Sequence, residues 1–125
     1  MGTVRIISPK DIDSVKILCK PILESAVNKS ELDTVDLWLG KCKNDIAQLW
    51  ATDDLWAITE VISTKTGRAL HIVCMAGKFD QLMVDEIESW AKLMQCQKSY
   101  FSGRQGWIKR MPDYKLKSVT LYKEL

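Results

Sequence analysis

The amino-terminal part of the chain changes from the hydrophobic pattern of a strand to that of a helix. Residues Thr3 to Ile7 are a short β-rich run and predict a strand. Ser8, Pro9 and Asp11 form a helix-start signal, with Ser8 as the expected N-cap. Pro21 is expected to kink this helix or divide it. Helical spacing predicts one apolar face made of Ile12, Val15, Leu18, Cys19, Ile22, Leu23 and Ala26.

A second amphipathic helix and three strands follow. Ser30 with Asp33 repeats the capping signal, and the apolar positions of the expected helix are Leu32, Val35, Trp38, Leu39 and Cys42, with Gly40 weakening its end. The β-rich runs are Asp45 to Thr52, Leu55 to Thr64 and Arg68 to Ala76. They are separated by Asp53-Asp54 and by Lys65-Thr66-Gly67, both of which favour tight turns. The sequence therefore predicts an antiparallel meander.

The carboxyl-terminal third returns to a mixed pattern. A helix is expected from about Asp80 to Gln95, a short strand at Gln97 to Ser102, and a short helix near Gln105 to Met111 that Pro112 stops. Alternation predicts a last strand at Lys117 to Tyr122. The expected order is β-α-α-β-β-β-α-β-α-β, an α/β (mixed α+β) domain. Its sheet should be mixed and mostly antiparallel, with helices on both faces.

Composition adds limits to this interpretation. The chain has 125 residues, 46% of them hydrophobic and 27% charged, which is typical of one globular domain, here residues 1–125. A net charge of +2 from interspersed charges gives no basic stripe for nucleic acid. No apolar run is long enough to span a membrane, and no signal-peptide core is present, so a cytoplasmic location is expected.

The cysteines and tryptophans are interpreted mainly as core residues. Cysteines occur at positions 19, 42, 74 and 96 without the close spacing of zinc or redox motifs, so buried reduced thiols and no metal site are expected. Five tryptophans are many for this length. Trp50 and Trp56 flank the Asp53-Asp54 turn, so one of them could line a ligand cleft or an oligomer contact such as a homodimer.

Two local sequences, taken with the order of elements, carry a resemblance to a known family. Residues 5–12, Arg-Ile-Ile-Ser-Pro-Lys-Asp-Ile, look like an I-R-x-A-x-x-x-D opening, and residues 82–91 look like an L-L-x-x-L-E-x-W-A helix. Both motifs belong to the GNAT (Gcn5-related N-acetyltransferase) superfamily, and the chain is most similar to its small members encoded by tailed bacteriophages. The resemblance implies an acyl-CoA-dependent N-acyltransferase. Such an enzyme uses acetyl-CoA (coenzyme A) in direct transfer to a small-molecule or peptide amine.

The coenzyme loop departs from the family pattern R/Q-x-x-G-x-G/A. Alignment on the helix places Met75 at the Arg/Gln position and Asp80 at the last glycine. The resemblance assigns the coenzyme-binding segment to Cys74, Met75, Ala76, Gly77 and Lys78, with Arg104 able to tie down a buried acceptor or to reach an anionic ligand. Free backbone amides of residues 76–80 could face an anion, although Asp80 would repel it and is better explained as an N-cap. Coenzyme binding is therefore expected to be weak or absent.

The candidate chemistry lies on the second hairpin. His71 and Glu60 would face each other if the turn centres on Lys65-Thr66, and a carboxylate-held imidazole is a plausible general base for an amine. A turn centred one residue later would break that register, and a structural histidine is the commoner case. The family's Y-E-x-x-G-F tyrosine is missing, with Lys109 near its place. Cys74 is expected to pack. The alternative function is a catalytically inactive GNAT-like phage structural or interaction module.

Overall fold

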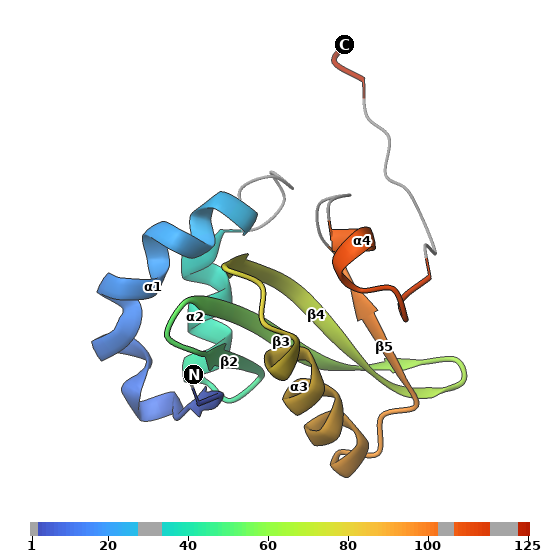
Figure 1. Cartoon of the computed structure of the whole chain (residues 1–125). Coiled ribbons are helices and arrows are strands. Elements are labelled where there is room, and N and C mark those ends of the chain that lie inside the picture. The colour runs from blue at the N-terminus through green and yellow to red at the C-terminus, as the bar shows by residue number, and fades with distance from the viewer. Residues whose placement is uncertain (1–2, 28–33, 103–106, 116–122) are drawn as a thin grey trace.

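The framework of the protein is a mixed sheet whose strands lie side by side in sequence order (Figure 1). The computed structural model describes residues 3–27, 34–102, 107–115 and 123–125. The sheet contains β1 (Arg5–Ile7), β2 (Ala47–Ala51), β3 (Leu55–Thr64), β4 (Gly67–Gly77) and β5 (Lys98–Phe101). Pairing is antiparallel from β1 to β4 and parallel between β4 and β5. The predicted α+β class, meander and mixed sheet are confirmed, while the last predicted strand, 117–122, lies outside the described residues.

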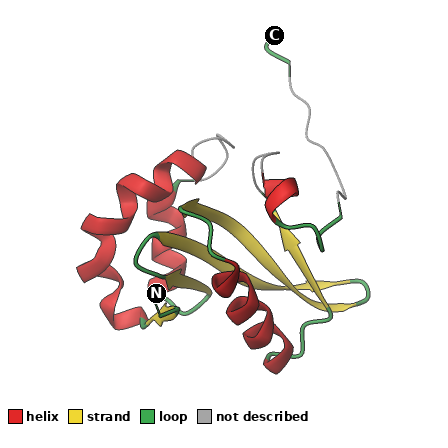
Figure 2. Ribbon diagram, in the orientation of Figure 1, coloured by secondary structure: helices red, strands yellow, loops and turns green. Residues whose placement is uncertain are grey.

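Helices cover both faces of this sheet, as predicted (Figure 2). The short 3₁₀ helix η1 (Pro9–Asp11) leads into α1 (Ile12–Val27), and α1 packs with α2 (Val35–Lys43) on one face. On the other face lie α3 (Gln81–Leu93) and the single-turn helix α4 (Trp107–Arg110). No helix in the described part of the chain is both long and apolar enough to cross a bilayer. Because apolar layers cover both faces of the sheet, the first half of β3 is buried on both sides, and so is the last half of β4.

The first helix begins where predicted but without the side-chain cap that its start signal suggests. Ser8 precedes η1 as its N-cap but makes no side-chain capping bond, and Asp11 N instead donates to the Ser8 backbone oxygen at 2.8 Å. Pro21 does not divide the helix, since α1 runs continuously through it. Pro21 and Ile17 both lie on the exposed side. Because the Ile17 carbonyl that loses its helical partner there can reach water, the missing bond costs less than it would in the core.

The buried face of α1 is narrower than the sequence pattern predicts. Leu18 is 66% exposed and Ile22 is 40% exposed, so the expectation that both lie in the core is wrong. The residues that do pack into the core from this helix are Ile12, Cys19, Leu23 and Val27. The second helix also begins later than predicted: Thr34 is its N-cap, and Thr34 Oγ1 accepts from Leu37 N at 3.1 Å. The expected cap at Ser30 and Asp33 lies outside the described residues.

The β3–β4 hairpin positions the candidate site. Its turn at Lys65-Thr66 pairs Thr64 with Gly67, and Thr64 Oγ1 donates to the Gly67 oxygen at 2.8 Å. From that turn the register runs without a break to Thr59 opposite Ile72. Ile58 then pairs with Cys74, so Val73 is an extra residue on β4. This bulge interrupts the alternation of β4 just beyond the position of His71.

Candidate functional site

Glu60 and His71 lie opposite each other on the β3–β4 hairpin. They are registered partners, and His71 Nδ1 lies 2.9 Å from Glu60 Oε2. Glu60 follows Trp56 and Ile58 at two-residue spacing, and both of those pack in the layer under α1 and α2. The pair therefore lies on the α1/α2 face of the sheet. The predicted facing register is confirmed.

Ser102 completes this group from a third strand. Its Oγ lies 2.8 Å from His71 Nε2, and its backbone N donates to the Ile72 oxygen at 3.1 Å, directly after β5 ends. A carboxylate can only accept, so the neutral imidazole donates from Nδ1 to Glu60, and Nε2 accepts from the Ser102 hydroxyl. The three side chains thus form one hydrogen-bonded line from Glu60 to solvent-exposed Ser102.

The sequence pattern missed Ser102. Its contact with His71 depends on the parallel register of β4 and β5, in which His71 pairs with Tyr100. That register is set by the length and packing of α3, which connects the two strands, and it leaves no local motif. The available signal was weak: a serine that ends a strand next to the strand that carries the histidine. Glu60 and His71 retain 22% and 23% side-chain exposure, so the pair is partly shielded from solvent.

The β4 segment assigned to the coenzyme has its side chains in the core. Cys74 and Ala76 pack in the α1/α2 layer, whereas Met75 packs against α3. Burial raises the pKa of the Cys74 thiol to about 12, so it stays protonated at neutral pH and cannot act as a nucleophile. Any contact of these three residues with a coenzyme falls to their backbone.

Gly77 and Lys78 are engaged with the preceding turn. Gly77 has a φ of +120°, and a Cβ placed there would collide with the Asp54 backbone oxygen. That oxygen also accepts from Lys78 N at 2.9 Å. The expectation that the Lys78 amide is free to face an anion is therefore wrong, because the hairpin uses it. The Lys78 side chain is exposed and remains the cation of this segment.

The N-terminus of α3 is occupied by its own capping residue. Asp80 is the N-cap, and its Oδ1 accepts from Leu82 N at 2.9 Å, as the sequence predicted. A helix N-terminus attracts anions through its free N–H groups and positive dipole end. Here the Asp80 carboxylate satisfies one of those groups and partly neutralises the dipole. An incoming phosphate would have to approach this carboxylate.

The sheet opens beside the candidate site. The registered pairing of β4 with β5 ends at Ile72 and Phe101, while β4 continues to Gly77. Figure 1 shows the two strands moving apart toward their carboxyl ends. On the α3 face, the Trp107 ring lies 5.6 Å from Phe79 and 5.6 Å from Phe101, so aromatic side chains connect the two sides of the opening. β4 and β5 therefore diverge beside the segment Cys74 to Lys78.

The remaining candidates lie elsewhere. Arg104 falls outside the described residues, and Lys109 is exposed on α4. Tyr114 hydrogen-bonds with Glu88 at 2.8 Å and with Ser99 at 2.7 Å, and burial raises the pKa of its phenol. Ser99 pairs with Leu70, whose side chain packs on the α3 face, so Tyr114 lies on the opposite side of the sheet from His71. In the described ranges, no group of three or more His, Cys, Asp or Glu side chains is arranged to hold a metal ion.

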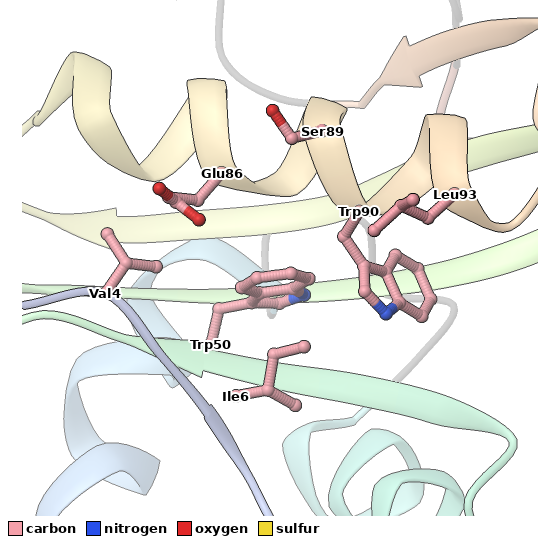
Figure 3. Close-up of a pocket in the computed structure, with 7 residues that line it drawn as sticks. All are labelled: Val4, Ile6, Trp50, Glu86, Ser89, Trp90 and Leu93. Carbon is pink, nitrogen blue, oxygen red and sulfur yellow. The ribbon is translucent and has the colours of Figure 1, made fainter.

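A separate hollow of about 410 Å³ lies between β1 and α3 (Figure 3). Trp50 forms part of its wall with Trp90, and the two rings meet edge to face at 5.7 Å. Of the two tryptophans considered for a cleft, Trp50 therefore lines one, while Trp56 packs in the α1/α2 layer. Among the described residues that line the hollow, Glu86 is a carboxylate and none of the others carries a charge.

Comparisons with solved structures identify the fold as that of the GNAT acetyltransferases. Similar structures include an aminoglycoside acetyltransferase from an uncultured soil metagenomic sample in complex with sisomicin (7% identity, 99% of this chain and 96% of that chain, TM-score 0.73). A predicted acetyltransferase with acetyl-CoA from Clostridium acetobutylicum is 18% identical over 100% and 96% of the chains (TM-score 0.63). A GNAT family acetyltransferase from Staphylococcus aureus is 12% identical over 99% and 98% (TM-score 0.60). No family model and no curated protein sequence matches the chain.

Proposed function

We propose that this protein is an N-acyltransferase that moves an acyl group from acyl-CoA to a small-molecule or peptide amine in the cytoplasm. The observation that supports this best is the hydrogen-bonded line of Glu60, His71 and Ser102 beside the opening between β4 and β5. The fold is shared with acetyltransferases, two of which were solved with acetyl-CoA or CoA. Because β4 and β5 diverge next to the histidine, an acyl thioester bound between these strands would lie close to Nε2.

In this proposal His71 is the proton acceptor. The amine nitrogen attacks the acyl carbonyl in a ternary complex, and its proton passes through the Ser102 hydroxyl to Nε2. Glu60 fixes the tautomer of the ring and stabilises the imidazolium that forms. The C–S bond then breaks, and the thiol leaves with a proton. Because the tyrosine of the family pattern is missing, His71 gives this proton to the leaving sulfur.

Coenzyme affinity should be weak. The loop has no arginine at Met75, Lys78 N is already bonded, and Asp80 carries a negative charge at the N-terminus of α3. A lost charge-assisted contact and an added repulsion each cost about 1–3 kcal/mol. Asp80→Asn keeps a capping side chain and removes the charge, so it should tighten coenzyme A binding several-fold with little change in melting temperature. Submicromolar affinity of the wild-type protein in calorimetric titration would contradict this account of the loop.

The test of activity is release of free coenzyme A from acetyl-CoA with a panel of amine acceptors. The panel should contain aminoglycosides and peptides with an amino-terminal alanine, because two of the similar structures are acetyltransferases named for such substrates. His71→Asn should lower kcat/KM by about 100-fold or more. Ser63→Ala, an exposed serine on the same hairpin, is the matched control and should behave as wild type. Wild-type turnover by His71→Asn would overturn the role of His71.

The second candidate function is a catalytically inactive interaction module of GNAT fold, of the kind found in tailed bacteriophages. It is favoured by one observation: the Asp80 cap places a carboxylate where a coenzyme phosphate would approach the N-terminus of α3. It predicts no coenzyme A binding even to Asp80→Asn. Millimolar coenzyme A without any calorimetric signal in either protein would favour the module over the enzyme.

A further inference from the structure

The order of groups around His71 matches that of a nucleophilic serine. Glu60 Oε2 lies 2.9 Å from Nδ1, and Ser102 Oγ lies 2.8 Å from Nε2. A carboxylate on one ring nitrogen and a hydroxyl on the other is the geometry by which an imidazole activates a serine, whatever the fold that carries it. We propose that Ser102 is a catalytic nucleophile that takes an acyl group from a small ester or thioester and passes it to water.

The backbone holds the three side chains in place. Glu60 and His71 are paired across an antiparallel hairpin, and Ser102 is attached to the neighbouring position of β4 by its bond to the Ile72 oxygen. The line therefore depends on sheet hydrogen bonds at both ends, which makes it better defined than a contact between loops. Ser102 itself is exposed, so a substrate can reach it, in contrast to the buried thiol of Cys74.

The reaction balances with water as the only co-reactant. Ser102 Oγ forms a bond to the acyl carbon while its proton moves to His71 Nε2. The bond from that carbon to the leaving oxygen or sulfur breaks, and the leaving alcohol or thiol takes the proton. Water then attacks the acyl-serine and gives a proton to Nε2, the Oγ–C bond breaks, and Ser102 regains its proton. Ester or thioester and water become a carboxylic acid and an alcohol or thiol.

The opening beside Ser102 can also stabilise the negative oxygen that forms at the acyl carbon. Beyond Ile72, β4 has no registered partner in β5 within the described ranges, although it continues to Gly77. In this proposal, a backbone N–H on the β5 side of this part of β4 donates to that oxygen. The activity goes beyond the proposed acyl transfer, because neither coenzyme A nor an amine takes part.

The first experiment is labelling of the full-length protein with a fluorophosphonate, followed by peptide mass spectrometry. The phosphonyl group should be found on Ser102, and Ser102→Ala should abolish the label. His71→Asn should slow labelling by about 100-fold or more, because the serine loses its base. Ser63→Ala should be labelled on Ser102 at the wild-type rate, since the exposed Ser63 takes no part in the line. A label on other residues, or one indifferent to His71→Asn, would overturn the proposal.

The second experiment is hydrolysis of p-nitrophenyl acetate in the absence of coenzyme A. Wild type should release a rapid burst of nitrophenol that matches the enzyme concentration, and Ser102→Ala should show none. A burst that persists in Ser102→Ala would mean that the imidazole itself is acylated, which excludes the serine. If no burst is seen, the acyltransferase proposal still stands, because its test is coenzyme A release with amines. If amines do not release coenzyme A, the nucleophilic serine still stands, because its test is fluorophosphonate labelling. The two proposals can therefore fail separately. Melting temperatures of each variant exclude unfolding as the cause of a loss.

Discussion

Gly77→Ala should destabilise the protein strongly because of its position at the end of β4. The φ of +120° lies in a region that residues with a Cβ rarely adopt, and the new Cβ would meet the Asp54 backbone oxygen. Holding an alanine in that region costs about 1–2 kcal/mol. Moving the Asp53-Asp54 turn away would also break the 2.9 Å bond from Lys78 N to Asp54 O, worth about 1 kcal/mol. The expected loss is about 3 kcal/mol, or roughly 10 °C in melting temperature for a domain of this size.

Gly40→Ala is the matched control for this substitution. Gly40 lies inside α2, and a Cβ there would have no heavy atom within 4 Å. The same chemical change should therefore stabilise the protein by about 0.5–1 kcal/mol, because alanine loses less conformational entropy in a helix than glycine does. Thermal denaturation followed by circular dichroism measures both variants under one set of conditions. The opposite signs make the comparison independent of any general effect of adding a methyl group.

The two variants also decide what Gly77 does. If Gly77 is needed for the close contact of β4 with the Asp53-Asp54 turn, its replacement lowers the melting temperature by roughly 10 °C. If it serves instead as a phosphate-loop glycine, Gly77→Ala should weaken coenzyme A binding while melting stays near that of wild type. A melting temperature within two or three degrees of wild type (about 0.6–0.9 kcal/mol) would refute the steric argument.

Two further predictions concern the other buried groups. Iodoacetamide at mildly alkaline pH should alkylate the partly exposed Cys96 well before Cys74, because burial raises the pKa of Cys74 to about 12. Peptide mass spectrometry that finds Cys74 alkylated first would contradict this. The pKa of Tyr114 is raised in the folded protein, mainly by burial, so the neutral phenol favours folding and stability should fall as pH rises above 10.0, the ordinary value. Tyr114→Phe should lose about 1–2 kcal/mol at neutral pH through the bond to Glu88, and urea denaturation should show a shallower decline above that pH.

The elements that the sequence predicted well are those whose signals are local. The meander follows from turn residues between β-rich runs, and the start of α3 follows from Asp80, whose side chain caps the helix as expected. From the sequence, the turn of the second hairpin could centre on Lys65-Thr66 or one residue later, and the two turns give different registers. The bond from Thr64 Oγ1 to the Gly67 oxygen and the positive φ of Gly67 fix the turn at Lys65-Thr66. Glu60 and His71 therefore face each other.

The predictions that failed depend on long-range packing. Leu18 and Ile22 fit the helical pattern, yet α1 presents only its Ile12, Cys19, Leu23 and Val27 edge to the sheet, and spacing alone does not define the width of a contact. Ser102 was missed for the same kind of reason. Its distance from His71 is set by how α3 brings β5 alongside β4, which no short motif records.

The protein shares the fold of the acetyltransferases, but its reactive side chains do not lie where the family's coenzyme loop would be. In the segment where the resemblance placed a coenzyme, side chains enter the two cores, Gly77 and Lys78 hold the Asp54 turn, and Asp80 caps its own helix. The Glu60–His71–Ser102 line is instead carried by the hairpin and by the end of β5. A side chain that already satisfies the fold is not available to a ligand without a cost in stability. The chemistry of this protein should therefore follow the histidine rather than the loop, and variants of the two regions should affect different measurements.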